Sequence, residues 1–271
     1  MDRDEIRVAV LRMEGTNCED ETVKAFRSVG VEAEAVHVKQ FYSDMIRFEE
    51  QRSIFDYHCL VFPGGFSAGD YIRAGAIFSA RVKSVLRKDI EEFIKMGYPI
   101  LGICNGFQVL VELGVLPGFD EDRPVSDKPE MALAINDSNK FECRPTLLKK
   151  ESRKCVFVSR LNEDIVMFPV AHAEGKVTFP SGREDEYVER LLSNDQIVFR
   201  YVDDEGNYAG YPWNPNGSYF NIAGICNATH TVFGLMPHPE RAFFGYQVGK
   251  SEGYGDGYCI FRSVVDYLEK L

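Results

Sequence analysis

A cysteine stands between two glycines in residues 102–106, Gly-Ile-Cys-Asn-Gly, directly after an apolar segment and directly before a helical pattern. Glycines on both sides allow a sharp turn that presents the cysteine side chain in the open, as a nucleophile requires. The N-terminus of the following helix favours thiolate over thiol. The motif predicts Cys104 as a nucleophile and the N–H of Asn105 as an oxyanion donor. Taken alone, it fits a buried structural cysteine equally well.

A second glycine-containing segment, residues 63–67 (Pro-Gly-Gly-Phe-Ser), ends another expected strand. The backbone N–H groups of Gly64 and Gly65 are bare there, so a reacting oxygen can approach them closely. This suits the other half of an oxyanion hole. A plain strand-to-helix turn is the alternative interpretation.

A base for the thiol is predicted in residues 237–240, Pro-His-Pro-Glu. In an extended segment, residues two apart lie on one side of the chain. A thiol nucleophile needs a base, and the base needs an orienting acid, so Cys104, His238 and Glu240 form the predicted triad. His172 and Glu174 have the same spacing, and spacing alone does not reject them.

The first half of the chain must position several of these residues. In this half, strands and helices alternate. Strands are expected at 6–13, 31–38, 59–62 and 99–103, and helices at 18–29, 79–96 and 104–113. This alternation predicts an α/β fold with a doubly wound, mostly parallel sheet.

The second half of the chain is dominated by short apolar segments that are broken by polar turns. Strands are expected at 132–135, 143–148, 156–159, 166–170, 197–202, 222–227 and 231–236, and helices at 184–192 and 264–271. This part should form a mixed or antiparallel extension of the sheet. Because no long linker interrupts the chain, residues 1–271 are predicted to form a single domain.

Composition excludes several classes of protein. The formal net charge of −11 argues against a nucleic-acid binder and against a protein of anionic membrane surfaces. No apolar run approaches the roughly 20 residues of a membrane span, and the charged first residues lack the apolar part of a signal peptide. The seven scattered cysteines indicate reduced thiols in a cytoplasmic protein. No metal-ligand spacing and no phosphate-binding glycine loop occurs, so we expect neither a metal site nor ATP binding on this chain.

Together these motifs resemble the triad-type (class I) glutamine amidotransferases. The resemblance is closer to members that serve phosphoribosylformylglycinamidine synthases, which place Asn after the cysteine. It runs from about Ile6 to the C-terminal helix, and its other stretches are residues 15–22, 63–70, 73–76, 136–142, 169–175, 214–218, 222–227 and 236–242.

The resemblance implies a flavodoxin-like glutaminase domain with Cys104, His238 and Glu240 as its triad. It implies that His172 is not the base and that it lies in the glutamine pocket or at the partner interface. It also implies further pocket residues, namely Gln108, Asn136 and Phe141.

The resemblance further implies where the ammonia goes. A large ATP-dependent synthetase uses it to convert formylglycinamide ribonucleotide to formylglycinamidine ribonucleotide in purine biosynthesis, and a small accessory subunit often joins. ATP and Mg²⁺ belong to the synthetase, and this chain needs no cofactor. Three alternatives stay open: a glutaminase for another synthetase, a stand-alone amide hydrolase, and a non-catalytic binding module.

Overall fold

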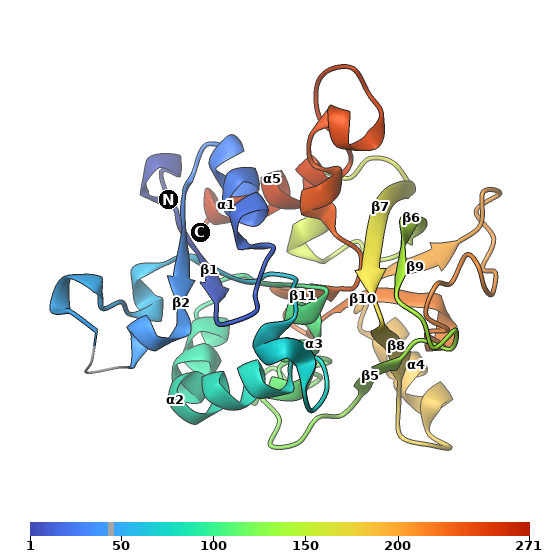
Figure 1. The fold of residues 1–271 in the computed structure, drawn as a ribbon, viewed down its shortest axis with the longest axis horizontal. Helices are drawn as coiled ribbons and strands as arrows, with labels where there is room; N and C mark the ends of the chain where they lie inside the picture. The colour runs from blue at the N-terminus through green and yellow to red at the C-terminus, as the bar shows by residue number, and fades with distance from the viewer. Residues whose placement is uncertain (43–45) are drawn as a thin grey trace.

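A nine-stranded sheet forms the centre of the protein, whose computed structural model describes residues 1–42 and 46–271 (Figure 1). The strands lie in the order β2-β1-β3-β4-β11-β10-β9-β6-β7. The first five are parallel: β2 (Glu32–His37), β1 (Arg7–Arg12), β3 (Cys59–Phe62), β4 (Ile100–Ile103) and β11 (Val232–Leu235). The others pair antiparallel: β10 (Ile222–Cys226), β9 (Ile197–Val202), β6 (Glu142–Lys150) and β7 (Ile165–His172). The predicted parallel sheet with an antiparallel extension is confirmed.

Helices cover both faces of the parallel half. On one face α1 (Glu19–Ser28) packs against α5 (Gly257–Leu268), and on the other α2 (Ala76–Lys95) packs against α3 (Asn105–Leu113) (Figure 1). Strands β3, β4 and β11 are buried along their whole length, which only a sheet covered on both faces allows. The doubly wound arrangement is therefore confirmed. Within residues 1–42 and 46–271, no helix is both long and apolar enough to cross a lipid bilayer.

The remaining regular elements belong to the second half of the chain. Strands β5 (Ala132–Ile135) and β8 (Glu174–Thr178) pair as a separate antiparallel ribbon, and α4 (Glu184–Ser193) follows β8. Strand β8 was not predicted, because its sequence Glu-Gly-Lys-Val-Thr holds a single large apolar residue. Helix α5 begins at Gly257 rather than at 264.

The strand predicted at 156–159 is wrong, because Val156–Val158 forms a 3₁₀ turn. The carboxylate of Asp195 accepts hydrogen bonds from the backbone N–H groups of Arg153 and Lys154, both at 2.9 Å, and bends the chain there. The Val156 N–H then donates to the His230 carbonyl, at 3.1 Å, instead of to a neighbouring strand. A contact between segments distant in sequence thus overrides the strand preference of Val-Phe-Val.

Four adjacent parallel strands end at one edge of the sheet. Their order is β1-β3-β4-β11, and they are followed in turn by residues 13–18, the glycine loop at 63–70, Cys104 and residues 236–240. In open α/β sheets, sites form outside the carboxyl ends of the strands. The fold therefore brings the predicted nucleophile, oxyanion loop and base together.

Replacing Gly106 by Ala tests how closely α3 packs on β3. A Cβ at Gly106 would lie 1.8 Å from the Phe62 carbonyl oxygen, and this strand backbone has no room to move. We expect Gly106→Ala to lower the free energy of unfolding by roughly 1–3 kcal/mol or more, measured by urea denaturation. Gly210→Ala is the control, because a Cβ there meets nothing within 4 Å. Equal unfolding midpoints for the two variants would contradict the close packing.

Candidate active site

Cys104 occupies a strained turn between β4 and α3. Its φ of 51° and ψ of −107° lie outside the regions that residues with a Cβ favour, as in a nucleophile elbow. Its N–H donates to the Leu235 carbonyl at 2.8 Å, which anchors the turn to β11. Glycine is required at position 102, since a Cβ there would lie 2.7 Å from the Gly106 carbonyl oxygen. The thiol reaches the wall of a cavity, where it lies 3.6 Å from the Ala171 carbonyl oxygen.

His238 and Glu240 follow β11 and are both buried. The imidazole Nδ1 lies 2.5 Å from Glu240 Oε1, while Nε2 is buried and has no hydrogen-bond partner among the described residues. Burial opposes protonation of His238, but the Glu240 carboxylate and the Cys104 thiol outweigh it and raise the pKa of His238 well above its ordinary value. The site therefore favours an imidazolium beside Cys104, the state that pairs with a thiolate.

The loop after β3 supplies backbone donors at the same place. Gly64 packs against the base, because a Cβ there would lie 2.7 Å from His238 Cε1. Gly65 has a φ of +142° and lines the cavity with Cys104. Within the described chain, the N–H groups of Gly65 and Asn105 donate to no other group. Both are therefore free for a developing oxyanion.

The Asn105 side chain connects this loop to the elbow helix. Its Oδ1 accepts from the Ser67 N–H at 3.4 Å, and its Nδ2 donates to Asp70 Oδ1 at 3.2 Å and to Gln108 Oε1 at 3.0 Å. Gln108 in turn donates to the Glu174 carbonyl at 2.7 Å. Asn105 thus fixes the distance between the two predicted halves of the oxyanion hole.

A cavity of about 180 Å³ opens at Cys104, with Gly65, Gln108 and His172 in its wall. Pockets for drug-sized ligands are typically about 300–1,000 Å³. The cavity therefore suits a molecule about the size of an amino acid.

Two carboxylates in the cavity wall were not predicted as pocket residues: Asp70 was not singled out, and Glu174 was considered only as the acid of a rival pair. Asp70 and Glu174 form no ion pair among the described residues. Burial raises the pKa of Asp70 to about 6, and Glu174 adds to the shift, although hydrogen bonds from Gly75 and Asn105 oppose it. Both residues lie in stretches that the family resemblance had marked, but no pattern distinguishes a cavity carboxylate from a surface one.

His172 lines the cavity, but it does not pair with Glu174. Its Nδ1 lies 3.2 Å from Asn136 Oδ1, while a Glu174 carboxylate oxygen accepts from the Ala74 N–H at 3.1 Å. Burial and the nearby charge of His238 lower the pKa of His172 to about 3, so the ring is neutral. His172 and Glu174 therefore do not pair with each other as a base and its orienting acid.

Asn136 and Phe141, the other predicted pocket residues, lie outside the cavity wall. Asn136 is buried behind His172 and also donates to the His172 carbonyl at 2.9 Å. Phe141 is 50% exposed, and its ring centre lies 6.2 Å from that of Phe66, a residue of the cavity wall. Asn136 therefore supports the site, and Phe141 forms part of its outer rim.

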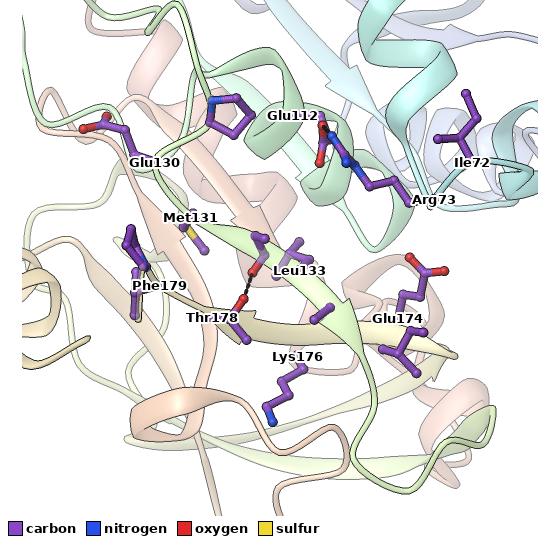
Figure 2. A pocket seen from close by; sticks show the side chains of 15 residues that line it. Ile72, Arg73, Glu112, Glu130, Met131, Leu133, Glu174, Lys176, Thr178 and Phe179 are labelled. Atoms are coloured by element: carbon purple, nitrogen blue, oxygen red, sulfur yellow. Dashed lines mark hydrogen bonds and ion pairs between the residues drawn. The ribbon is translucent and has the colours of Figure 1, made fainter. Parts of the chain in front are cut away.

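A larger open hollow of about 770 Å³ adjoins the cavity, and Glu174 lines both (Figure 2). Figure 2 shows the β5–β8 ribbon running beneath it, with Ile72 and Arg73 on its opposite side. Arg73 pairs with Glu112 at 2.5 Å, so its charge is already matched. The hollow extends the mouth of the cavity over the ribbon.

Comparison with known proteins agrees with this geometry. A family model described as a CobB/CobQ-like glutamine amidotransferase domain matches residues 5–268. The PurQ subunit of phosphoribosylformylglycinamidine synthase from Archaeoglobus fulgidus is 88% identical over 271 residues, all of both chains. The PurQ subunit from Picrophilus torridus is 49% identical over 262 residues, 96% of this chain and 97% of the relative.

A solved structure of PurLQS from Thermotoga maritima contains a similar chain. It has a TM-score of 0.71 and 30% identity, over 97% of this chain and 99% of that one. The similarity thus extends over both halves of the sheet. The chain belongs to the CobB/CobQ-like glutamine amidotransferase family, and within it to the PurQ subunits of phosphoribosylformylglycinamidine synthase.

Proposed function

We propose that this chain is a glutaminase that hydrolyses glutamine to glutamate and ammonia with Cys104, His238 and Glu240. One observation carries the proposal: a buried imidazole is held between a carboxylate and a strained cysteine, at the carboxyl edge of a parallel sheet. A structural cysteine has no need of this strain, which persists only where the surroundings enforce it.

We assign one role to each of these residues. The Cys104 thiolate attacks the carboxamide carbon, and the N–H groups of Gly65 and Asn105 receive the negative oxygen. Removing one such donor typically costs about 2.7–4 kcal/mol of transition-state stabilisation. His238 donates a proton to the departing ammonia and then takes one from the water that releases glutamate. Glu240, bound to Nδ1, fixes the imidazole tautomer and stabilises its cation.

Asp70 and Glu174 recognise the α-ammonium group of glutamine. They are carboxylates without a cationic partner among the described residues, and they share the cavity with the thiol. A bound ammonium would favour the charged form of Asp70, whose pKa burial now raises to about 6. Gln108 stands beside them and orients the substrate.

The ammonia passes to a synthetase subunit. The relatives are subunits of phosphoribosylformylglycinamidine synthase, and the similar solved chain is described as part of PurLQS. We propose that this chain assembles with the corresponding large synthetase, which uses ATP and Mg²⁺ to convert formylglycinamide ribonucleotide to formylglycinamidine ribonucleotide. A small accessory subunit completes the assembly.

Exposed apolar side chains around the cavity support a partner surface there. Ile72 and Tyr71 are 75% and 90% exposed, and they lie in the segment between the oxyanion loop and α2. Ile135 and Phe141 flank the ribbon side, and the hollow of Figure 2 lies between β8 and Ile72. Clustered exposed apolar groups commonly mark interaction sites. A synthetase docked here would receive the ammonia before it escapes.

We also propose that residues 1–271 form a single amidotransferase domain in a cytoplasmic protein. The buried apolar core runs from Ile6 to Leu268, which supports one folding unit. All seven cysteines are free thiols, which supports a reducing compartment.

Replacing Cys104 by Ala tests the proposed function. We expect Cys104→Ala to abolish glutamine-dependent synthesis in the complex with the synthetase and to preserve synthesis from ammonium salts, because the two chemistries occur on separate chains. Cys226→Ala, which removes a buried thiol that does not line the cavity, should retain both activities. Loss of both activities in Cys104→Ala with the complex intact would contradict the proposal. Rapid glutamate release without any synthetase would favour a stand-alone hydrolase.

Replacing each cavity histidine separately tests the choice of base. We expect His238→Ala to lower the kcat for glutamate release by about 10²-fold or more, because it removes the proposed base. His172→Ala should act mainly on KM, since this neutral ring only lines the cavity. Steady-state kinetics in the complex distinguish the two effects. A larger loss of kcat in His172→Ala would move the triad to His172.

Replacing Asp70 by Asn tests substrate recognition. The raised pKa of Asp70 also predicts how this replacement changes the stability of the fold at different pH values. The pKa of Asp70 is raised from 3.8 to about 6 in the folded protein, so the folded state holds its proton more tightly and loses stability as pH rises through this window. We expect Asp70→Asn to raise KM for glutamine and to raise Tm at pH 7 but not at pH 3.5. Asp127→Asn should show the opposite trend in Tm, because Arg87 lowers the pKa of Asp127. An unchanged KM would exclude Asp70 from substrate binding.

A further inference from the structure

Cys18 lies against the base although it is far from it in sequence. It precedes α1, is buried, and approaches the space left open by Gly64: a Cβ at Gly64 would lie 3.1 Å from Cys18 Sγ and 2.7 Å from His238 Cε1. The sulfur and the polar side-chain atoms of His238 and Glu240 all lie within 4.8 Å of one another. A second thiol therefore borders the imidazole, on a different element from Cys104.

Helix stability does not explain this cysteine. Cys18 occupies the N-cap position of α1, where Ser, Thr, Asp or Asn would accept a hydrogen bond from the first turn. Its side chain makes no such bond. The sulfur instead turns inward and accepts a hydrogen bond from Arg241 Nη2 at 3.1 Å. Residue 18 therefore provides no side-chain cap for α1, and its sulfur contacts the site instead.

Arg241 connects the sulfur to both sides of the site. Its Nε donates to Glu21 in the first turn of α1 at 2.8 Å and lies 4.0 Å from Glu240 Oε1. A half-buried guanidinium thus bridges the start of α1 and the acid behind the base.

The backbone of the same segment holds the oxyanion loop. The Cys18 N–H donates to the Gly64 carbonyl at 3.3 Å, and the Phe66 N–H donates to the Gly15 carbonyl at 3.0 Å. A Cβ at Gly15 would lie 2.2 Å from the Phe66 carbonyl oxygen, so the two segments are in close contact. Residue 18 consequently contacts the base through its side chain and the oxyanion loop through its backbone.

Cys18, His238 and Glu240 have the composition of a metal-ligand set, but their surroundings oppose a cation. Arg241 places a positive charge 3.1 Å from the sulfur. Burial also raises the pKa of Cys18, which keeps the thiol neutral. A metal would have to break the 2.5 Å contact between His238 and Glu240.

We propose that Cys18, held by Arg241, is a positioning residue that keeps the imidazole of His238 and the oxyanion loop aligned with Cys104. The inference rests on the proposed glutaminase function. A neutral, polarisable thiol fills the space beside the ring without competing for its proton. The titratable side chains that face His238 are Glu240, Cys104, Cys18 and His172, and the Arg241 guanidinium lies 4.0 Å from Glu240 Oε1.

The test compares Cys18→Ala with Cys18→Ser and with the matched control Cys226→Ala, all in the complex with the synthetase. We expect Cys18→Ala to lower kcat for glutamate release by about tenfold or more, since small misplacements of reacting groups have large effects. KM should change less than about twofold, because Cys18 does not line the cavity. Cys18→Ser should restore most of kcat, since its hydroxyl still accepts from Arg241. Synthesis from ammonium salts should be unaffected.

A second readout is the rate at which a glutamine-like electrophile labels Cys104, measured against pH. In Arg241→Gln the alkaline limb of this profile should move to higher pH, because loss of a positive charge near the ring favours the imidazolium. This variant decides the question if Cys18→Ala fails to fold, and an unchanged profile would then overturn the proposal. A kcat for Cys18→Ala equal to that of Cys226→Ala would also overturn it. Absence of glutamate release by the wild-type complex would instead reject the proposed function itself.

Discussion

The backbone hydrogen bond from Cys104 to Leu235 joins the strand of the proposed nucleophile to the strand of the proposed base. It continues the parallel register of β4 and β11, in which Gly102 pairs with Gly234 and Ile103 with Leu235. A slip of one residue would turn every side chain of one strand to the other face of the sheet. At Gly102 and Gly234 a Cβ would meet α3 side chains at 2.6 and 2.2 Å. The distance between thiol and imidazole therefore depends on two glycines that have no chemistry of their own.

Charge is separated within a small volume of the site. His238 is the buried group whose protonation is favoured, and its pKa is raised because a carboxylate and a thiol outweigh burial. His172 stays neutral nearby, because burial and then the charge of His238 lower its pKa. Asp70 and Glu174 provide negative charge farther along the cavity. One end of the cavity thus suits an oxyanion and the other suits an ammonium group, which matches the two ends of glutamine.

Local sequence predicted most of the parallel half, and it also singled out the three residues that we propose as the triad. Short, fully buried strands are continuous apolar runs, and Gly-x-Cys-x-Gly is a local signal for a turn. The failures involve contacts between distant segments. The turn at 156–159 depends on Asp195, and Cys18 meets Arg241 across 223 positions of sequence. Asn136 was expected in the pocket, but it holds the ring of His172, and only the folded chain distinguishes these two positions.

Strand β11 lies between β4 and β10 in the sheet, yet it is the last strand of the chain to be made. In the order of synthesis, β1 to β4 and Cys104 precede β11 and the imidazole of His238. The Leu235 carbonyl that anchors the turn at Cys104 also belongs to β11. The gap between β4 and β10 is therefore filled, and the proposed thiol–imidazole pair formed, only after residues 232–240 have been made.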